Sequence, residues 1–257
     1  MPADASSSAE AFSPCVVIPV HEHHAPLALL LPRLTALAGL PVLLIDDGSS
    51  PACAAALRAL AHGGQPPVLL RRQEPNQGKG AAVKAGLRWA AELGHTHGLQ
   101  LDADGQHDLS ALPGLLEAAR LEPSAAVCGR PVFGQDAPAA RRRWRRLTNF
   151  WLAVNTLSRD IPDGMCGLRV YPLRSTLPLL GACGDRMEFD PELLVRLRWA
   201  GVALRFLPVP VSYPANGTSG FRALEDNARI SWMHTRLFFG MLPRAPGLAL
   251  GRARRRH

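Results

Sequence analysis

Short runs of apolar residues alternate with longer amphipathic segments along the first half of the chain. Short apolar runs occur at 15–19, 42–45, 68–70 and 125–128, and a fifth at 98–101 is interrupted only by Gln100. Short runs without polar alternation are typical of strands that are buried on both faces of a sheet. Helical spacing of apolar residues separates them, at 26–38, 51–61, 80–93 and 110–120. This alternation predicts an α/β fold with an open, mainly parallel sheet flanked by helices.

The second half of the chain has a less regular pattern. It predicts two helices, at 139–158 and 189–200, and two strands, at 166–171 and 203–213. Pro208 and Pro210 remove backbone donors from the last strand, which places it at an edge of the sheet. A final helix is predicted from about 221 to 240, with one apolar stripe formed by Ile230, Met233, Leu237 and Met241.

Three segments follow from these patterns. Residues 1–13 are small and polar and are expected to form a disordered leader, without the basic-then-apolar pattern of a signal peptide. Residues 14–220 are expected to form the α/β domain, and residues 221–257 an amphipathic helix with a frayed basic tail. No run of about 18 uninterrupted apolar residues occurs, so no transmembrane helix is predicted.

The composition points to an anionic partner and a reducing compartment. The formal net charge is +8, and nearly all of the positive charge is Arg, which binds phosphate in a bidentate manner. A GC-rich genome produces the same Arg bias. Nucleic acid is not an expected partner, because no recognised nucleic-acid module is present. The five Cys are scattered without a CxxC pair, which favours reduced thiols in a cytoplasmic protein.

The strongest chemical signal follows the fourth predicted strand, where Asp102 and Asp104 stand one residue apart. Two such carboxylates repel each other unless a cation lies between them, and Mg²⁺ or Mn²⁺ prefers such oxygen ligands. Gln106 could add an amide oxygen. A metal ion there would act as a Lewis acid on a diphosphate leaving group. Taken alone, the segment could also be a solvated acidic turn.

Two further polar clusters follow other strands. Asp46-Asp47-Gly48-Ser49-Ser50 offers carboxylates to a nucleobase or ribose, although Ser50 could instead cap the next helix. In Asn76-Gln77-Gly78-Lys79-Gly80 the glycines allow close backbone approach to a ligand and Lys79 offers a charge for phosphate. The spacing is not that of a Walker A loop. Because ligands bind at the carboxyl ends of parallel strands, the clusters are expected to converge on one edge.

Together the clusters resemble glycosyltransferase family 2, which has the GT-A fold. Within this family the chain is similar to the polyprenyl-phosphate sugar synthases of the dolichyl-phosphate mannose synthase type. The resemblance runs from Val16 to about Tyr213, and its motifs Val-Val-Ile-Pro, Asp-Asp-Gly-Ser, Asn-x-Gly-Lys-Gly and Asp-Ala-Asp-Gly-Gln-His occur in the family's order. It implies an inverting enzyme that moves a sugar from a UDP- or GDP-sugar to a lipid or polyprenyl-phosphate acceptor.

The resemblance also implies site residues. Donor binding would involve Pro19, His21, His23, Asp47, Lys79, Asp102, Arg130, Arg169 and Arg222. Asp102, Asp104 and Gln106 would hold Mg²⁺ or Mn²⁺. The catalytic and acceptor-side acids would be Asp104, Asp163, Glu188 and Asp190. A hydroxyl acceptor would need one of them as a general base, whereas an acceptor phosphate is already an anion.

Two departures from the family pattern leave the nucleotide base and the acceptor open. After the first strand the family usually shows Pro-x-Tyr-Asn-Glu, and here His21 and His23 occupy the Tyr and Glu positions. The loop at 214–222 carries a single basic residue, Arg222, where lipid-phosphate synthases tend to carry more.

Aromatic residues beside arginines predict contact with a membrane. Five Arg surround Trp144 between Arg141 and Arg146, and the final helix carries Trp232, Phe238 and Phe239. Arg attracts anionic headgroups and Trp favours the membrane interface, so the final helix is expected to be interfacial. The protein would then be peripheral on the cytoplasmic face of the inner membrane. Alternatively, the helix docks on the sheet with its Arg residues in water.

Two other functions use similar features. A sugar-nucleotide-forming nucleotidyltransferase would use a similar sheet and metal ion, but residues 21–26 lack its usual glycine-rich, Arg-containing loop. A non-catalytic module that binds a nucleotide-sugar or a lipid would also explain the altered His21 and His23 positions.

Overall fold

Seven strands form one sheet in the computed structural model, which describes residues 11–61, 63–133, 139–211 and 223–254. The strand order across the sheet is β3-β2-β1-β4-β6-β5-β7. The strands are β1 (Pro14–Val20), β2 (Val42–Asp47), β3 (Val68–Gln73), β4 (His97–Gln100), β5 (Ala126–Phe133), β6 (Arg169–Pro172) and β7 (Leu204–Val211).

The sheet is mainly parallel, as the sequence predicted. β6 runs antiparallel to both of its neighbours, β4 and β5, and the other four neighbouring pairs are parallel. β7 lies at an edge, which confirms the position predicted from Pro208 and Pro210. The ends of β1, β2 and β4 therefore meet at one edge of the sheet, where the polar clusters follow.

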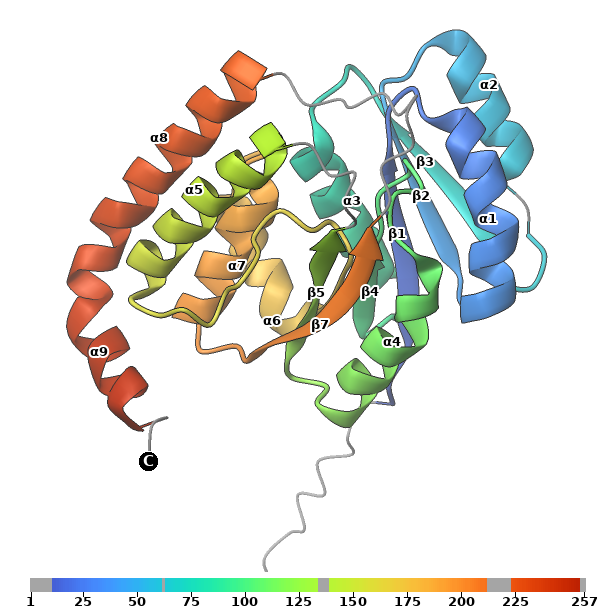
Figure 1. The fold of residues 1–257 in the computed structure, drawn as a ribbon. Coiled ribbons are helices and arrows are strands. Elements are labelled where there is room, and N and C mark those ends of the chain that lie inside the picture. The colour runs from blue at the N-terminus through green and yellow to red at the C-terminus, as the bar shows by residue number, and fades with distance from the viewer. Residues whose placement is uncertain (1–10, 62, 134–138, 212–222, 255–257) are drawn as a thin grey trace, which may run out of the picture.

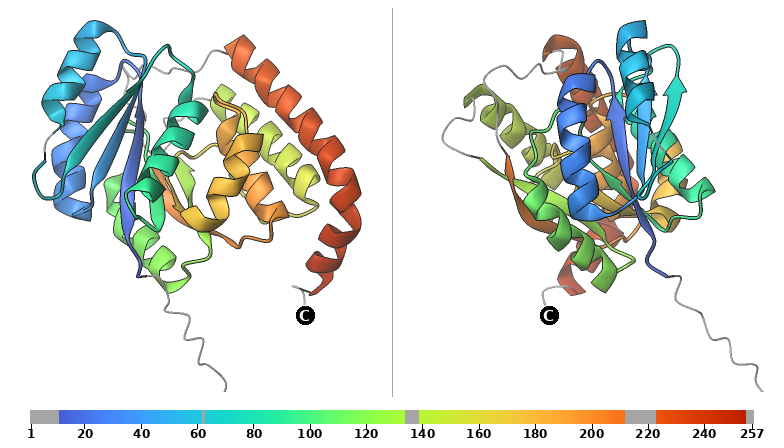
Figure 2. Two further views of the ribbon diagram at one scale, coloured as in Figure 1. Left: turned by 180° about the vertical axis from the view of Figure 1, so that it is seen from behind. Right: turned by 90° about the vertical axis from the view of Figure 1, so that its right-hand side faces the viewer.

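Helices cover both faces of the sheet (Figures 1 and 2). α1, α2 and α4 share a buried apolar cluster on one face, and α3, α6 and α7 share another cluster on the opposite face. α5 and α8 pack together and against α7. The helices are α1 (His24–Ala38), α2 (Pro51–Leu60), α3 (Lys79–Glu92), η1 (Leu109–Ala111), α4 (Leu112–Leu121), α5 (Ala139–Thr156), α6 (Leu173–Thr176), η2 (Leu177–Ala182), α7 (Phe189–Trp199), α8 (Ala223–Met241), η3 (Leu242–Arg244) and α9 (Ala245–Arg254).

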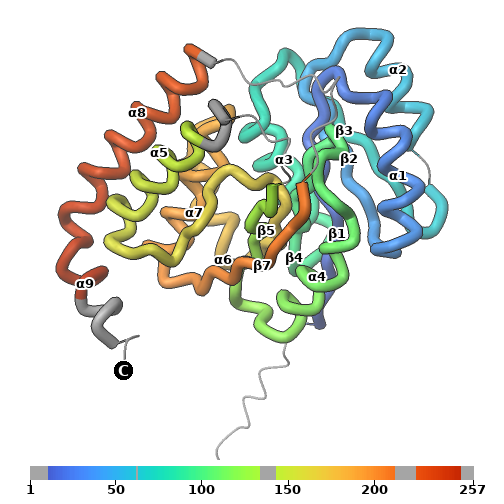
Figure 3. Tube along the Cα trace, viewed as in Figure 1, coloured from blue at the N-terminus to red at the C-terminus, as the bar shows by residue number. Residues whose placement is uncertain are grey.

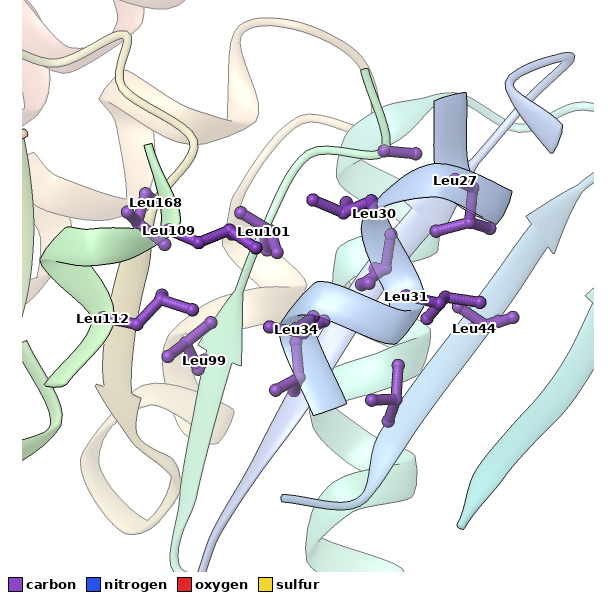
Figure 4. Close-up of a cluster of buried hydrophobic side chains, with 14 of the residues drawn as sticks. Leu27, Leu30, Leu31, Leu34, Leu44, Leu99, Leu101, Leu109, Leu112 and Leu168 are labelled. Carbon is purple, nitrogen blue, oxygen red and sulfur yellow. The ribbon is translucent and has the colours of Figure 1, made fainter. Parts of the chain in front are cut away.

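The strand pattern explains the two cores. On β1, Val16 and Ile18 enter the core under α1, while the intervening Val17 enters the core under α3. This is the period-two alternation of a strand covered on both faces. Figure 4 shows the first core, where leucines of α1 such as Leu30 and Leu34 lie above the sheet.

The C-terminal segment differs from the single helix that was predicted. Figure 3 traces α8 alongside α5, followed by the short η3 turn and then α9. Pro243 lies in η3, where a missing backbone N–H favours a break between helices. The expected fraying of the basic tail is wrong as far as Arg254, because α9 extends to that residue. Within the described residues, no helix is long and apolar enough to cross a bilayer.

A buried carboxylate anchors α8 to the domain. Glu192 of α7 is 0% exposed, and its side chain pairs with Arg196 at 2.6 Å and with Arg236 of α8 at 3.2 Å. The apolar stripe of α8, which includes Met233 and Leu237, is buried, as the alternative of a docked helix implies. α8 is therefore fixed to α5 and α7 on one side and leaves its opposite side exposed.

The predicted leader overlaps the folded domain at its end. Residues 1–10 lie outside the described residues, but Phe12 packs its ring 4.7 Å from that of His97. Ser13 N donates a hydrogen bond to Thr96 Oγ1 at 2.8 Å. These contacts join residues 12 and 13 to the start of β4.

Candidate active site

A cavity of about 810 Å³ lies beside the carboxyl ends of β1, β2 and β4. This is where ligands bind in open α/β sheets. The predicted site residues that line it are Pro19, His21, His23, Asp47, Lys79, Asp102, Asp104, Gln106 and Asp190. Asp47 and Asp104 therefore face the same cavity, as a site for a nucleotide and a metal-bound diphosphate requires.

Asp47 shapes the loop that leads into α3. Its side chain is almost fully buried, and Oδ1 accepts hydrogen bonds from Gln77 N at 2.8 Å and Gln73 Nε2 at 2.6 Å. Oδ2 accepts from Gly78 N at 2.8 Å. Contact between Asp47 and a nucleotide stays a prediction. The three bonds add a positioning role, which fixes the loop against the end of β2.

The glycines beside Lys79 allow the protein to pack closely on itself. A Cβ atom on Gly78 would lie 2.6 Å from Asp185 O, and one on Gly80 would lie 2.6 Å from Phe189 Cβ. Gly78 also has a φ of 111°, which L side chains rarely adopt. The sequence predicted that these glycines admit a ligand. In the structure, the segment that approaches them is 185–189.

The end of the cavity beside His21 is formed by two joined loops. His21 Nδ1 lies 3.0 Å from Asp47 O. The next residue, Glu22, has a φ of 58°, and its carboxylate accepts hydrogen bonds from both the backbone N–H and the hydroxyl of Ser50. A non-glycine residue in this region is uncommon and is held by its surroundings. The Glu22–Ser50 contact therefore orients His21 and His23 beside the cavity.

Asp102 and Asp104 differ in their electrostatic surroundings. Burial tends to raise the pKa of Asp102, but the Lys79 ammonium outweighs it and holds that pKa below its usual value. The pKa of Asp104 is raised, first by burial and then by repulsion from Asp102. Asp104 Oδ1 accepts a hydrogen bond from Gln106 N at 3.0 Å. A nearby cation would therefore stabilise the ionised form of Asp104 more than that of Asp102.

The residues present fit a divalent metal ion that also binds a ligand. The carboxylate of Asp104 and the amide of Gln106 offer hard oxygen donors, and both residues line the cavity. Within the described residues, no group of three or more His, Cys, Asp or Glu side chains is arranged to hold a metal ion by itself. Phosphate oxygens would therefore have to complete the coordination, as is usual for Mg²⁺ at nucleotide sites.

Lys79 connects the donor side of the cavity to α7. Its Nζ lies 2.7 Å from Asp102 Oδ1 and 2.8 Å from Asp190 Oδ2. The other oxygen of Asp190 accepts a hydrogen bond from Gln100 Nε2 at 2.9 Å. Asp190 lines the cavity, but both of its oxygens are engaged by protein donors. This arrangement suits Asp190 to holding Lys79 rather than to taking a proton from an acceptor.

The other two predicted acids do not line the cavity. Asp163 Oδ1 accepts from the backbone N–H of Cys166 at 2.8 Å, and its Oδ2 lies 3.2 Å from Arg145 Nε. Glu188 is buried at the start of α7, and its Oε1 accepts from the backbone N–H of Arg186 at 3.3 Å. An acceptor-side role for these two acids stays a prediction. They order the segments that carry Arg145 and Arg186.

Arg169 is buried and engaged by the protein, and its contact with phosphate stays a prediction. Its side chain is 0% exposed and does not line the cavity. Its guanidinium donates hydrogen bonds to four protein oxygens: Cys166 O at 2.8 Å, Asp190 O at 2.6 Å, Gly164 O at 2.7 Å and Tyr171 Oη at 3.0 Å. Because the guanidinium is buried behind these partners, it is not exposed to the cavity.

Of the two remaining predicted arginines, only Arg130 falls within the described residues. Arg130 of β5 is exposed and does not line the cavity, whereas Pro131 and Phe133 do. Side chains alternate along a strand, so Arg130 points to the opposite side from Phe133. The contact of Arg130 with the donor stays a prediction. Arg222 lies outside the described residues.

The far half of the cavity contains residues that sequence reasoning missed. Arg145 and Trp144 of α5 line it, together with Arg186 from the segment before α7. The arginine cluster around Trp144 was noted, but as a membrane contact. The first turn of α8 adds Glu225, Asp226 and Asn227. No local pattern marks these residues, because α8 reaches the cavity only through long-range packing.

Solved structures of low sequence identity share this fold. Glucosyl-3-phosphoglycerate synthase from Mycobacterium tuberculosis, crystallised with Mn²⁺ and UDP-glucose, superposes with a TM-score of 0.65 at 14% identity. The match covers 89% of this chain and 78% of that chain. It confirms the expected GT-A architecture.

Relatives of known function are more similar in sequence. A polyprenol monophosphomannose synthase from Mycolicibacterium smegmatis is 32% identical over 61% of this chain. An undecaprenyl-phosphate 4-deoxy-4-formamido-L-arabinose transferase from Edwardsiella ictaluri is 31% identical over 77%. The chain spans only 60% and 59% of the lengths of these two relatives. An undecaprenyl-phosphate mannosyltransferase from Micrococcus luteus is 36% identical over 77% of this chain and 82% of its own length.

The family model agrees with these relatives. The model of glycosyl transferase family 2 matches residues 15–176, which include every strand from β1 to β6 and the Asp102–Asp104 pair. The match covers more than half of the chain, and it contains the donor half of the cavity described above. This protein therefore belongs to glycosyl transferase family 2.

Proposed function

We propose that the protein transfers a sugar, with inversion, from a UDP- or GDP-sugar to a polyprenyl phosphate at a membrane surface. The observation that carries the proposal is a single cavity that runs from Asp102 and Asp104 to the arginines of α5 and of the segment before α7. Carboxylates suit a metal-bound diphosphate, and arginines suit an anionic acceptor. Three relatives named above act on polyprenol or undecaprenyl phosphates, which supports the same class of acceptor.

In the donor half, Asp104 and Gln106 would hold Mg²⁺ or Mn²⁺. When bound, the ion supplies Lewis-acid stabilisation of the charge that develops on the departing nucleoside diphosphate. Lys79 lines the same half and presents a positive charge to that diphosphate. His21, His23 and the Asp47-held loop form the end that would receive the nucleoside. Electrostatic stabilisation of the leaving group is then the main catalytic contribution of these residues.

In the acceptor half, the positions of the carboxylates favour an acceptor that is already an anion. Asp163 and Glu188 lie outside the cavity, and Asp190 is engaged by Lys79 and Gln100. A hydroxyl acceptor would need a base placed to remove its proton, whereas a phosphate attacks without one. Arg145 and Arg186 line this half and suit phosphate binding through their guanidinium groups.

The proposed membrane contact rests on the outer sides of α5 and α8. On α8, Trp232 is 64% exposed and Phe239 is 65% exposed, seven residues apart and on the side away from the buried stripe. On α5, Phe150 is 59% exposed, and the neighbouring Trp151 stacks its ring 6.3 Å from His234 of α8. α5 and α8 lie side by side at one end of the molecule (Figure 2).

Arginines accompany these aromatic residues. Arg143, Arg146 and Arg229 are exposed on the same two helices. Apolar rings beside cations suit an anionic lipid surface. Trp144 is both exposed and part of the cavity wall, so the cavity reaches this side of the molecule. A polyprenyl phosphate could then enter while its chain stays in lipid, with the protein peripheral on the cytoplasmic face of the inner membrane.

Removing the outer aromatic residues of α8 is expected to weaken vesicle binding. Trp232→Ala with Phe239→Ala should lower partitioning onto phosphatidylglycerol vesicles by about tenfold or more, because two large apolar side chains no longer enter the interface. Vesicle co-sedimentation measures this. The control pair is Leu29→Ala with Leu121→Ala, which are also exposed but lie on α1 and α4. Equal loss in both pairs would contradict the proposed face.

Product analysis tests the whole proposal. The full chain, incubated with Mn²⁺, UDP- or GDP-sugars and undecaprenyl phosphate, is expected to release nucleoside diphosphate and form a lipid-linked sugar. A parallel reaction offers 3-phosphoglycerate as a water-soluble phosphate acceptor. A third offers a nucleoside triphosphate with a sugar 1-phosphate. Transfer to 3-phosphoglycerate alone would reject the lipid acceptor, and release of pyrophosphate in the third reaction would favour a nucleotidyltransferase.

A further inference from the structure

Lysine occurs at only two positions of this arginine-rich chain, and both of them lie on α3. Lys79 lines the cavity, whereas Lys84 does not line it and is only 6% exposed. The side chain of Lys84 lies against the apolar cluster that α3 shares with α7, with its Nζ 5.9 Å from the centre of the Phe189 ring. An ammonium group in such surroundings is stable only where protein oxygens replace its water.

The oxygens that bind Lys84 belong to one segment, residues 183–187, which lies between η2 and α7. Lys84 Nζ donates hydrogen bonds to Cys183 O and to Asp185 Oδ1, the second at 2.8 Å. The side chain of Asp185 is 65% exposed, so water would solvate its carboxylate without the lysine. The contact therefore fixes where the 183–187 segment lies, rather than neutralising a buried acid.

Two backbone contacts hold the same segment. Ala81 N, in the first turn of α3, donates a hydrogen bond to Asp185 O at 2.8 Å. The residue before α3 is Gly78, which has no side chain to cap the helix, so this carbonyl satisfies one of its free N–H groups. From the other side, Gly184 N donates to Glu192 Oε2 of α7 at 2.9 Å. α3 therefore holds the 183–187 segment through Ala81 as well as through its buried lysine, and α7 holds it from the opposite side.

The 183–187 segment carries two residues of the cavity wall, Arg186 and Met187. Arg186 directly follows Asp185, the residue that α3 binds through both its side chain and its carbonyl oxygen. The Arg186 guanidinium also donates a hydrogen bond to Asn76 Oδ1 at 3.4 Å. A guanidinium that binds phosphate must be held within about 0.5 Å of its working position. The contacts to Asp185 therefore bear directly on the acceptor half of the cavity.

We propose that Lys84 is a positioning residue, which holds Arg186 in the cavity wall through the 183–187 segment and thereby sets the affinity for the acceptor phosphate. Lys84 does not line the cavity, so it acts on a ligand only through this segment. An ammonium is compact and can direct separate N–H donors at two nearby oxygens, which the planar guanidinium of an arginine does less readily. The inference rests on the proposed function in taking a polyprenyl phosphate as the acceptor.

Hydrogen–deuterium exchange of the full chain, read by mass spectrometry, tests whether Lys84 holds the segment. Lys84→Met keeps much of the side chain's length but supplies no N–H. Amides of residues 183–187 and of Ala81 are expected to exchange at least about tenfold faster in this variant than in the wild type. The control is Arg88→Met, which removes an exposed cation from the same helix and should leave exchange within about twofold. Unchanged protection of the segment in Lys84→Met would overturn the proposal.

A second variant keeps the test decisive if Lys84→Met fails to fold. Asp185→Ala removes the carboxylate that Lys84 binds, and because this side chain is largely exposed, the change opens no cavity in the core. The amides of residues 183–187 are expected to exchange about threefold faster or more, since the lysine then holds the segment through Cys183 O alone. Unchanged exchange in Asp185→Ala would also overturn the proposal.

Transfer kinetics test whether Lys84 acts through Arg186. In Lys84→Met the KM for undecaprenyl phosphate is expected to rise about tenfold, while kcat and the KM for the nucleotide-sugar stay within about threefold of the wild type. Arg186→Met should raise the same KM at least as much, and adding Lys84→Met to it should cause no further change, because the two substitutions remove one contact. Additive effects, or a lower kcat at unchanged KM, would overturn the positioning role.

The two measurements separate this inference from the proposed function. A wild-type protein that forms no lipid-linked sugar would reject the proposed acceptor. Hydrogen exchange needs no substrate, so it would still show whether Lys84 holds the segment that carries Arg186. Rapid exchange of that segment in the wild type itself would overturn the inference even if sugar transfer were confirmed.

Discussion

Replacing Asp104 with Asn is expected to lower kcat/KM for sugar transfer by about 10³-fold or more while the protein stays folded. The amide keeps the shape of the side chain and its bond from Gln106 N. It removes the negative charge that would hold a divalent ion beside the diphosphate in the proposed function. A thousandfold loss corresponds to about 4 kcal/mol of transition-state stabilisation. Initial rates of nucleoside diphosphate release over a range of Mn²⁺ concentrations measure the effect.

A matched control is available in the same loop. Asp108 is exposed, and its Oδ1 accepts a hydrogen bond from Ser110 N at 2.9 Å, which an Asn at this position keeps. Asp108→Asn should therefore leave transfer within about twofold of the wild type. Full activity of Asp104→Asn with an unchanged dependence on Mn²⁺ would reject the assigned metal site.

Replacing Arg169 with Met is expected to lower the free energy of unfolding by about 3–5 kcal/mol, because it leaves buried partners of the guanidinium without their donor. The side chain is 0% exposed and bonds the main-chain oxygens of Cys166, Gly164 and Asp190. Met fills much of the volume but supplies no N–H. Urea denaturation followed by circular dichroism measures the change.

The same substitution at an exposed arginine provides the control. Arg120 of α4 pairs with Glu117 at 2.7 Å on the surface, so Arg120→Met should change stability no more than an ordinary surface substitution. An Arg169→Met variant of normal stability that had lost nucleoside diphosphate binding would contradict the structural role. That result would instead support the phosphate contact that the resemblance implied.

The sheet and its donor edge could be predicted because their signals are local. Short apolar runs mark the strands, and the residues that follow three of them, including Asp47 and Asp104, face one cavity as the parallel topology requires. Prolines at 208 and 210 marked the edge strand for an equally local reason. Strand ends and backbone donors can be read from neighbouring residues without knowledge of the packing.

The roles that depended on burial could not be predicted. Arg169, Asp163 and Glu188 carry charges that suggest ligand contact, but each is buried and engaged by other protein groups. The residues in the acceptor half of the cavity were missed for a related reason. Asp226 of α8 lines the cavity only because α8 packs along α5 and α7, and no motif near residue 226 reports that packing.

The tight packing of Gly78 and Gly80 against Asp185 and Phe189 has a mechanical consequence. There is no room for a methyl group between the two segments, so they cannot shift independently. If an acceptor displaced Arg186 on binding, Gly78 would be displaced with it. The N–H of Gly78 donates a hydrogen bond to Asp47, so the displacement would reach that residue too. The two packed segments would therefore move together and couple the two ends of the cavity. Initial-rate kinetics would then show an obligatory order of substrate addition.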